Sequence, residues 1–414
     1  MATRPPVHRV VFSARMLAQL LAGFSSGLPL LLTGSTLQAW LKDERVDLGA
    51  IGLFALVGLP YTLKFFWSPL LDRYVPPFLG RRRGWMLLTQ LAVAAAIAGV
   101  GLSSPAVSPS GVAVLALALT FASASQDIVL DAYRREALEE VELGFGTSVF
   151  VSGYRLAMLV SGALALALAD RVPWRSVYFL MAGLMSVGVV TALLCREPVI
   201  DAPPPRSLRD AVVEPFVDFF RRRRAWLILA FIVLYKVGDQ MASAMTTPFV
   251  LDLGFSKTEL AAVVKVFGLV SMICGGLVGG IVMLKLGIRR SLWAFGILQA
   301  LSVLAFAALA QAGRIYGILA GAVSLENFSF GMGAAAYSAY MASQTNKRFT
   351  ATQFALFSSL TGIPRVLAAA PTGFLAKALG WTGFFTFCAA AAIPGLVLLL
   401  WVAPWREASS SPTD

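Results

Sequence analysis

Twelve apolar stretches recur along the chain, and each is long enough to cross a lipid bilayer as a helix. They lie at about 15–40, 48–70, 84–103, 110–131, 146–168, 175–195, 225–252, 258–285, 289–312, 316–343, 350–377 and 380–404. Of the 414 residues, 58% are hydrophobic and 14% are charged, whereas soluble domains carry about 25% charged residues. A soluble fold of this composition would expose large apolar patches. We therefore expect an all-α integral membrane protein with twelve transmembrane helices.

The longest polar segment divides these stretches into two groups of six. It covers residues 196–224 and contains "DAPPPRSLRD" and the run Arg221 to Arg224. We predict an N-terminal half at 1–195, a cytoplasmic linker at 196–224 and a C-terminal half at 225–414. Lys and Arg gather in the loops that would be cytoplasmic if the N-terminus is inside, so both termini are predicted to be cytoplasmic. This distribution explains the net charge of +12 without a nucleic-acid partner.

The two halves carry a faint repeat. "SPLLDRYVPPFLGRRRGW" (68–85) follows the second stretch, and "GGIVMLKLGIRR" (279–290) follows the eighth. Two pseudo-symmetric six-helix halves are the layout of major facilitator transporters, whose solute site lies between the halves near the midplane. The first loop resembles the G-x-x-x-D-R-x-G-R-R signature of that superfamily, in which this loop braces the cytoplasmic gate. The resemblance implies a gating role for Asp72, Arg73, Arg81, Arg82 and Arg83. Alternatively, these arginines act only as topology signals.

Several apolar stretches contain charged or amide residues. A charge inside a bilayer is costly unless it faces protein or water, so such residues usually mark the pathway of an ion or solute. Lys236 and Asp239 are three apart and can pair on one helical face. The alternatives are charges that reach the interface and ion pairs that are purely structural. The candidate substrate-binding residues are Lys64, Gln126, Arg155, Lys236, Asp239, Gln240 and Asn327.

Two aspartates in "SASQDIVLDAYRRE" (123–136) are candidates for proton coupling. Asp127 and Asp131 are four apart and would lie on one face of a helix. Burial and the neighbouring carboxylate favour the protonated form of each acid, whereas Arg134 and Arg135 favour the charged form. This balance suits a group that loads and releases a proton, and Glu326 is the third candidate. Alternatively, the pair only ties its helix to the next loop through the two arginines.

The sequence offers no sign of an enzyme, metal site or resident cofactor. It contains no G-x-x-x-x-G-K-[ST] nucleotide-binding signature, no nucleophile–base pair and no Cys/His constellation, and its three cysteines are widely spaced. Energy for transport therefore has to come from an ion gradient or from the gradient of the solute. We expect a monomer that contacts the lipid bilayer, protons and one small-molecule solute. Small-residue runs at 275–280 and 331–336 predict close helix packing.

Most of the chain resembles the AmpG family of permeases. The likeness is carried by "GFSSGLPLLLTGSTLQAWL" (23–41), "LKFFWSPLLDRYVPPFLGRRRGW" (63–85), "SQDIVLDAY" (125–133) and "LYKVGDQ" (234–240). It implies import of anhydromuropeptides (GlcNAc-anhydroMurNAc and its peptides) across the bacterial inner membrane, driven by the proton-motive force. Many members are longer, and shorter permeases of the same broad family import ferric siderophores of the pyochelin type for iron uptake. The motifs favour muropeptide and the length favours siderophore, so both cargoes stay open.

Overall fold

The computed structural model describes residues 7–199, 204–256, 259–260 and 263–405. These residues form helices and loops, with no strand among them. Nine of the helices in this part of the chain are long and apolar enough to cross a membrane, from Ala14–Asp43 to Thr372–Val402. The predicted all-α membrane architecture is confirmed.

Three of the twelve predicted spans are not among these nine helices. The stretch predicted at 48–70 is a series of short helices: α4 Leu48–Leu53, η1 Phe54–Gly58, α5 Leu59–Leu63, η2 Lys64–Phe66 and α6 Ser68–Arg73. Pro60 and Pro69 lie in the first turns of α5 and α6. Proline lacks an N–H and clashes with the preceding turn, so a helix restarts at each proline.

The two other differences lie late in the chain. The stretch at 316–343 is one helix, α19 (Tyr316–Ser343), and polar Glu326 and Asn327 interrupt its apolar sequence. The stretch at 350–377 is divided into α20 (Thr350–Leu360) and the π-helical turn η5 (Pro364–Ala368). The boundary expected just before residue 380 falls at Gly380, whose φ of 66° breaks α21 (Thr372–Ala391).

Contacts between Cα atoms divide the chain into two compact units. Unit 1 comprises the described residues up to Val217 together with Ala342–Ser359, and unit 2 comprises Asp218–Met341 and the described residues from Leu360 onward. Most of α20 therefore belongs with the N-terminal helices, although it lies late in the sequence. The boundaries at residues 195 and 225 remain predictions, because they divide the sequence into halves, whereas the units are defined by contacts in space.

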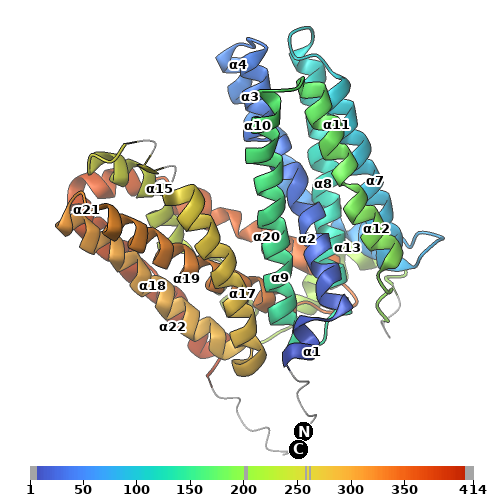
Figure 1. Cartoon of the computed structure of the whole chain (residues 1–414). Helices are drawn as coiled ribbons and strands as arrows, with labels where there is room; N and C mark the ends of the chain where they lie inside the picture. The colour runs from blue at the N-terminus through green and yellow to red at the C-terminus, as the bar shows by residue number, and fades with distance from the viewer. Residues whose placement is uncertain (1–6, 200–203, 257–258, 261–262, 406–414) are drawn as a thin grey trace, which may run out of the picture. The chain divides into compact units, whose positions relative to one another are not determined.

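Unit 1 is built around the five long helical segments between Ala14 and Leu194, which pack on one another (Figure 1). Its remaining elements are α1 Val7–Val11, α2 Ala14–Leu32, α3 Ser35–Asp43, α7 Arg81–Leu102, α8 Pro109–Ala137, α9 Glu140–Leu159, η3 Val160–Leu164, α10 Ala165–Ala169, α11 Trp174–Leu184, α12 Ser186–Leu194 and the start of α13 Leu208–Phe220. Helices α2 and α9 approach closely because glycines line their contact. A Cβ atom added at Gly23 would overlap the carbonyl oxygen of Phe150, and one at Gly153 would overlap that of Leu20.

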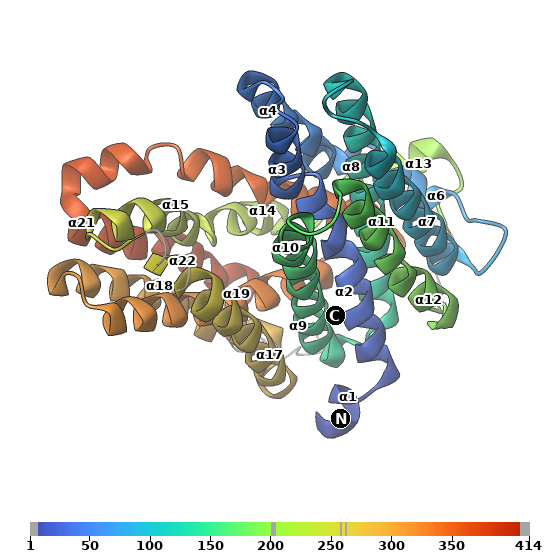
Figure 2. The same ribbon diagram turned by 45° about the horizontal axis from the view of Figure 1, so that its top comes forward.

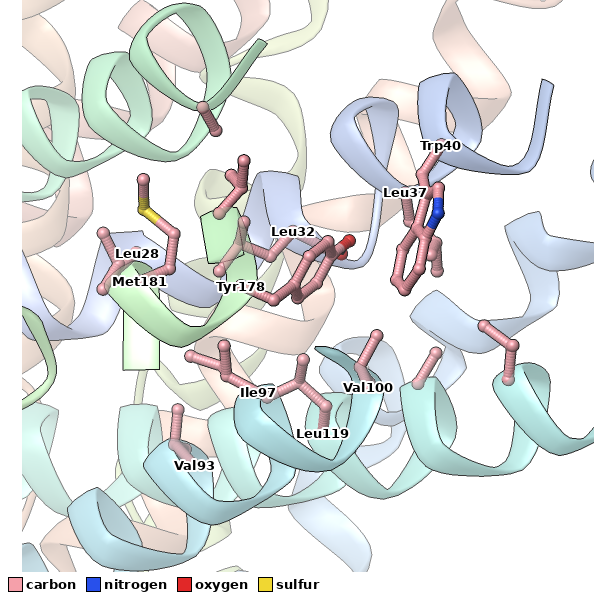
Figure 3. Packing of buried hydrophobic residues seen from close by; sticks show 14 of the residues in the cluster. Leu28, Leu32, Leu37, Trp40, Val93, Ile97, Val100, Leu119, Tyr178 and Met181 are labelled. Carbon is pink, nitrogen blue, oxygen red and sulfur yellow. The ribbon is translucent and has the colours of Figure 1, made fainter. Parts of the chain in front are cut away.

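The main core of unit 1 joins α2, α3, α7, α8 and α11. Figure 3 shows Leu28 and Leu32 facing Tyr178 and Met181, with Ile97 beneath them. All five side chains are fully buried. The hydroxyl of Tyr178 donates to the carbonyl oxygen of Leu32 at 2.9 Å, so its polar end is satisfied inside the core. This packing fixes the helices that carry the polar residues described below.

Unit 2 repeats the same kind of packing. Its elements are α14 Ala225–Leu234, α15 Val237–Asp252, η4 Val263–Gly268, α17 Leu269–Leu286, α18 Ile288–Ala312, most of α19, η5, α21 and α22 Ile393–Val402. Helix α21 packs on α18 and α15, and α22 packs on α14 (Figure 2). A Cβ atom at Gly275 would overlap the carbonyl oxygen of Phe328, and one at Gly331 would overlap that of Met272. The two small-residue runs therefore pack as predicted.

Candidate functional site

Most of the candidate residues fall into three polar groups. We call them the Asp127 cluster and the Asp72 network, both in unit 1, and the Lys236 cluster in unit 2. Each group is assembled by helices that pack within its own unit.

The Asp127 cluster lies where α8 faces α2 and η2. On α8, Asp127 and Asp131 are one turn apart, as the spacing predicts. The hydroxyl of Ser26 donates to Asp127 Oδ1 at 2.6 Å. Arg134 Nη2 donates to Asp131 Oδ1 at 2.8 Å, and Lys64 Nζ lies 3.9 Å from Asp131 Oδ2. Two acids and two bases thus share one largely buried patch.

The charges of the Asp127 cluster are held away from solvent. Lys64 is 7% exposed and Arg134 is 1% exposed. The Arg134 guanidinium also stacks over the rings of Phe150 and Phe354, at 4.5 and 5.5 Å from their centroids. Aromatic faces attract a cation and restrict where it can move. Arg134 is therefore held by Asp131 and two aromatic rings, whereas the Lys64 ammonium makes a longer contact of 3.9 Å with Asp131.

Gln126 and Arg155 are the two other solute-binding candidates in unit 1. Gln126 neighbours Asp127 in sequence and so points about 100° away around α8. It is fully buried, and neither its amide oxygen nor its nitrogen has a hydrogen-bond partner among the described residues. Arg155, on α9, contacts Met158 through Nη1 and Sδ at 3.7 Å. Their assignment to solute binding stays a prediction.

The Lys236 cluster forms where α14 gives way to α15. Lys236 Nζ lies 3.0 Å from Asp239 Oδ2, which confirms the pairing expected from their spacing. Gln299 of α18 joins them: its Nε2 donates to Asp239 at 3.3 Å and its Oε1 accepts from Lys236 at 3.5 Å. The Lys236 ammonium also lies 4.6 Å from the ring centroid of Phe330. Sequence reasoning missed Gln299, although a glutamine inside an apolar stretch was an available signal.

Glu326 extends the Lys236 cluster from α19. It is 9% exposed and interacts electrostatically with Asp239 and Lys236. The amide nitrogen of Asn327 donates to Glu326 at 2.9 Å and to the carbonyl oxygen of Val323 at the same distance. The cluster therefore holds two acids and one base. Gln240 is half-buried on α15.

A small cavity lies beside Asp239. It is lined by Tyr235, Gly296, Gln299 and Cys388 among others. The centre of a water molecule can occupy about 10 Å³ of this cavity. That space fits roughly one water. The carboxylate and amide on its wall supply polar partners for that water.

The Asp72 network is the most heavily bonded of the three groups. Asp72 is fully buried, and its Oδ1 accepts from Arg81 at 3.0 Å and from Arg82 at 2.8 Å. Its Oδ2 accepts from the backbone N–H and the hydroxyl of Thr352, each at 2.8 Å, while Ala351 N lies 3.4 Å from Oδ1. The first backbone N–H groups of a helix have no partner within the helix and attract a negative charge. Asp72 therefore holds the first turn of α20.

Two further glutamates complete this network. Arg82 forms a second, two-point pair with Glu136 at 2.6 and 2.7 Å. The carboxylate of Glu197 accepts from the backbone N–H groups of Arg82 and Arg83 at the start of α7. Sequence reasoning missed both acids. Glu136 lay inside the quoted 123–136 stretch, and Glu197 follows the end of the sixth apolar stretch.

The two remaining predicted gating residues take different positions. The Arg83 side chain donates to the carbonyl oxygens of Ala192 and Leu193 at the end of α12. Cations are favourable there because the last carbonyls of a helix are unpaired. Arg73 lies against the ring of Tyr74, with its guanidinium carbon 5.6 Å from the centroid. Asp72, Arg81 and Arg82 thus converge, whereas Arg73 lies apart from them.

The chain matches a family model described as Major Facilitator Superfamily over residues 16–369. It is 47% identical over 394 residues to the anhydromuropeptide permease of Escherichia coli K12, covering 95% of this chain and 80% of that protein. It is 35% identical to a protein of Rickettsia felis named putative transporter AmpG 4, covering 96% of this chain and 98% of that one.

Two solved structures show the same fold at low identity. The fucose:proton symporter of Escherichia coli superposes with a TM-score of 0.71 at 11% identity, covering 94% of this chain and 97% of that one. A proton:xylose symporter superposes with a TM-score of 0.67 at 9% identity, covering 96% of each chain.

Proposed function

The chain belongs to the major facilitator superfamily and, within it, to the AmpG permease family, and on that premise we propose that it imports anhydromuropeptides from the periplasm into the cytoplasm. The observation that carries the proposal is 47% identity to an anhydromuropeptide permease across 95% of the chain. Its relatives and its fold are those of transporters rather than enzymes. The polar side chains inside this otherwise apolar fold are the groups that would bind the solute.

Anhydromuropeptides combine sugar hydroxyls, amides and peptide carboxylates. Lys64, Arg155 and Lys236 offer positive charge for carboxylates, and Gln240 and Asn327 offer amide donors and acceptors. Asp239 and Glu326 can accept from hydroxyl groups. Each unit therefore carries side chains whose chemistry suits such a solute.

We further propose that protons drive uptake through the Asp127 cluster, with Glu326 as a second site. Asp131 has two cations beside it, whereas the described hydrogen bond of Asp127 comes from the neutral Ser26 hydroxyl. A carboxylate without a direct cation at hydrogen-bond distance is the easier one to protonate. Asp127 is therefore the proposed loading site, and Lys64 responds by moving toward the acid that remains charged.

The Asp72 network is the proposed gate. While Asp72 holds the first turn of α20, the helix that carries Thr352 is tied to α6 and α7. Opening requires that these bonds break together. The asymmetry of Lys and Arg in the loops supports placing the network, and both termini, on the cytoplasmic side of the bacterial inner membrane.

Cargo and coupling are tested together in proteoliposomes. The purified chain is reconstituted and given radiolabelled GlcNAc-anhydroMurNAc-peptide outside, with the outside acidic, and a parallel sample receives ferric pyochelin. We expect accumulation of the muropeptide that a protonophore abolishes. Accumulation of ferric pyochelin alone would replace the cargo with a siderophore, and accumulation that a protonophore leaves unchanged would refute proton coupling.

Chain length does not separate the two cargoes. The Rickettsia felis protein named as an AmpG transporter is covered to 98% by a chain of this length. A short chain therefore fits an AmpG-type permease as well as a siderophore permease. The muropeptide proposal rests on sequence identity, and the parallel assay decides between the cargoes.

A further inference from the structure

Helix α13 exposes an apolar face. Leu208, Val212, Val213, Val217 and Phe220 are each between 40% and 48% exposed. At 100° per residue these five positions spread over one side of the helix. Large apolar side chains in a row on a surface helix indicate contact with a partner or a membrane.

The other sides of α13 are already occupied. Ala211 and Pro215 are buried there, and Phe219 is buried at the end of the helix. Glu214 lies 3.3 Å from Arg348, and the carbonyl oxygen of Pro215 accepts from the amide of Gln353 at 3.0 Å. Helix α13 is therefore held in one orientation against the start of α20, with its apolar side turned away from these contacts.

The position of α13 in the chain places it at the bilayer surface. Only Arg221 to Arg224 separate Phe220 from the start of the span that begins at Ala225. Four residues reach at most about 14 Å. The Phe220 ring contacts the Trp226 ring with centroids 4.9 Å apart, and Trp226 is 73% exposed. Exposed tryptophan at the end of a span is typical of the membrane–water interface.

Positive charge accompanies the apolar side. Arg209 precedes Val213 by four residues and lies on the same side of α13. Arg206 before the helix and Arg221 and Arg223 after it are exposed. Two of the three acids of α13 lie on the opposite side, where Glu214 pairs with Arg348 and Asp218 pairs with Arg222. The third, Asp210, accepts from the backbone N–H of Ser207 at the start of the helix. The surface that faces the bilayer is therefore apolar with a basic border.

We propose that α13 lies in the membrane–water interface as an amphipathic helix, with its apolar side inserted between lipids and the flanking arginines bound to the phosphates of anionic phospholipids. Apolar insertion and attraction to anionic headgroups reinforce each other at such surfaces. Because Glu214 and Pro215 contact Arg348 and Gln353, bound lipid also steadies the start of α20. The inference does not depend on the cargo.

Insertion is tested with the full-length chain in nanodiscs of phosphatidylglycerol and phosphatidylcholine. A nitroxide is attached at Val213→Cys or at Glu214→Cys, in a background where the three native cysteines are replaced by Ser. We expect the label at 213 to relax more with oxygen, which concentrates in lipid, and the label at 214 to relax more with an aqueous nickel chelate. A label at 213 that is as accessible to the chelate as the label at 214 would overturn insertion.

The preference for anionic lipid is tested by charge removal. In the unlabelled chain, the double variant Arg221→Gln/Arg223→Gln loses two border charges. Its preference for spin-labelled phosphatidylglycerol over phosphatidylcholine is expected to fall by up to roughly thirty-fold, because each basic residue at an anionic surface contributes about fivefold. The matched control Arg171→Gln/Arg175→Gln removes two exposed charges, one before α11 and one in its first turn. An unchanged preference in the first variant, or an equal fall in the control, would overturn the anionic site.

Discussion

Replacing Asp72 by Asn should release the first turn of α20 while keeping the volume of the side chain. The carboxylate is fully buried and accepts from Arg81, Arg82 and the first turn of α20. Asn offers one acceptor oxygen in place of two and carries no charge. Arg81 and the α20 amides therefore compete for a single neutral acceptor.

The cost follows from the burial of these groups. Removing one partner of a buried ion pair costs about 3–5 kcal/mol because the other charge is left without compensation. Asn keeps part of the hydrogen bonding, and Arg82 keeps Glu136, so the low end of about 3 kcal/mol applies. Since roughly 1.4 kcal/mol is a factor of ten in an equilibrium, opening of the α20 turn should become about a hundredfold more frequent.

Backbone hydrogen exchange measures that opening directly. Peptides that cover residues 348–356 are followed by mass spectrometry in the purified protein and in Asp72→Asn. The Thr352 amide should exchange about a hundredfold faster in the variant. Asp218→Asn is the control, because its partly exposed pair with Arg222 is worth only about 0.3–0.5 kcal/mol.

A Thr352 amide that exchanges in Asp72→Asn within twofold of its rate in the original protein would show that Asp72 does not hold this turn. Equal acceleration of peptides throughout unit 1 would also refute a local role for Asp72, since that result would report general unfolding. A local effect confined to α20 and the start of α7 is the expected pattern.

Three further predictions concern coupling, the Lys236 cluster and packing. Asp127→Asn should abolish accumulation driven by a pH gradient but retain exchange of labelled for unlabelled solute, and loss of both would refute a role in proton loading. Lys236→Met should lower stability by about 3 kcal/mol because Asp239 is left buried without its cation, and adding Asp239→Leu should restore the melting temperature but not uptake. A double variant as unstable as the single one would contradict this. Gly23→Ala should lower the free energy of unfolding by about 1–3 kcal/mol, because the added Cβ overlaps Phe150. Gly183 has open space around it, so Gly183→Ala should leave the melting temperature unchanged or raise it. Equal melting temperatures for the two variants would refute the role of Gly23 in packing.

Much of the local structure could be predicted from the sequence. The one-turn spacing of Asp127 and Asp131 and the pairing of Lys236 with Asp239 depend only on helical geometry. The breaks at Pro60, Pro69 and Gly380 were harder to place, because a long apolar stretch hides them. Apolar length alone predicted one span at 48–70, whereas the prolines divide it into short helices.

The partners of these residues could not be predicted in the same way. Ser26 and Asp127 are 101 residues apart, and Asp72 and Thr352 are 280 apart. Gln299 was visible as a glutamine in an apolar stretch, but nothing in the sequence indicated its partners, and one glutamate in a loop, such as Glu197, usually has no special role. Each partner is chosen by which helix faces pack together.

The sequence by itself determined the membrane class, the all-helical architecture, the family and the residues whose burial needs an explanation. These follow from apolar length, from the cost of a charge in lipid and from motifs, all of which are local along the chain. Only the tertiary structure decided that α20 packs with the N-terminal helices, that Asp72 holds its first turn, and that Arg134 and Ser26 serve different aspartates. The physical reason is that hydrogen bonds and ion pairs act over a few ångströms, and helix packing alone brings distant residues within that range.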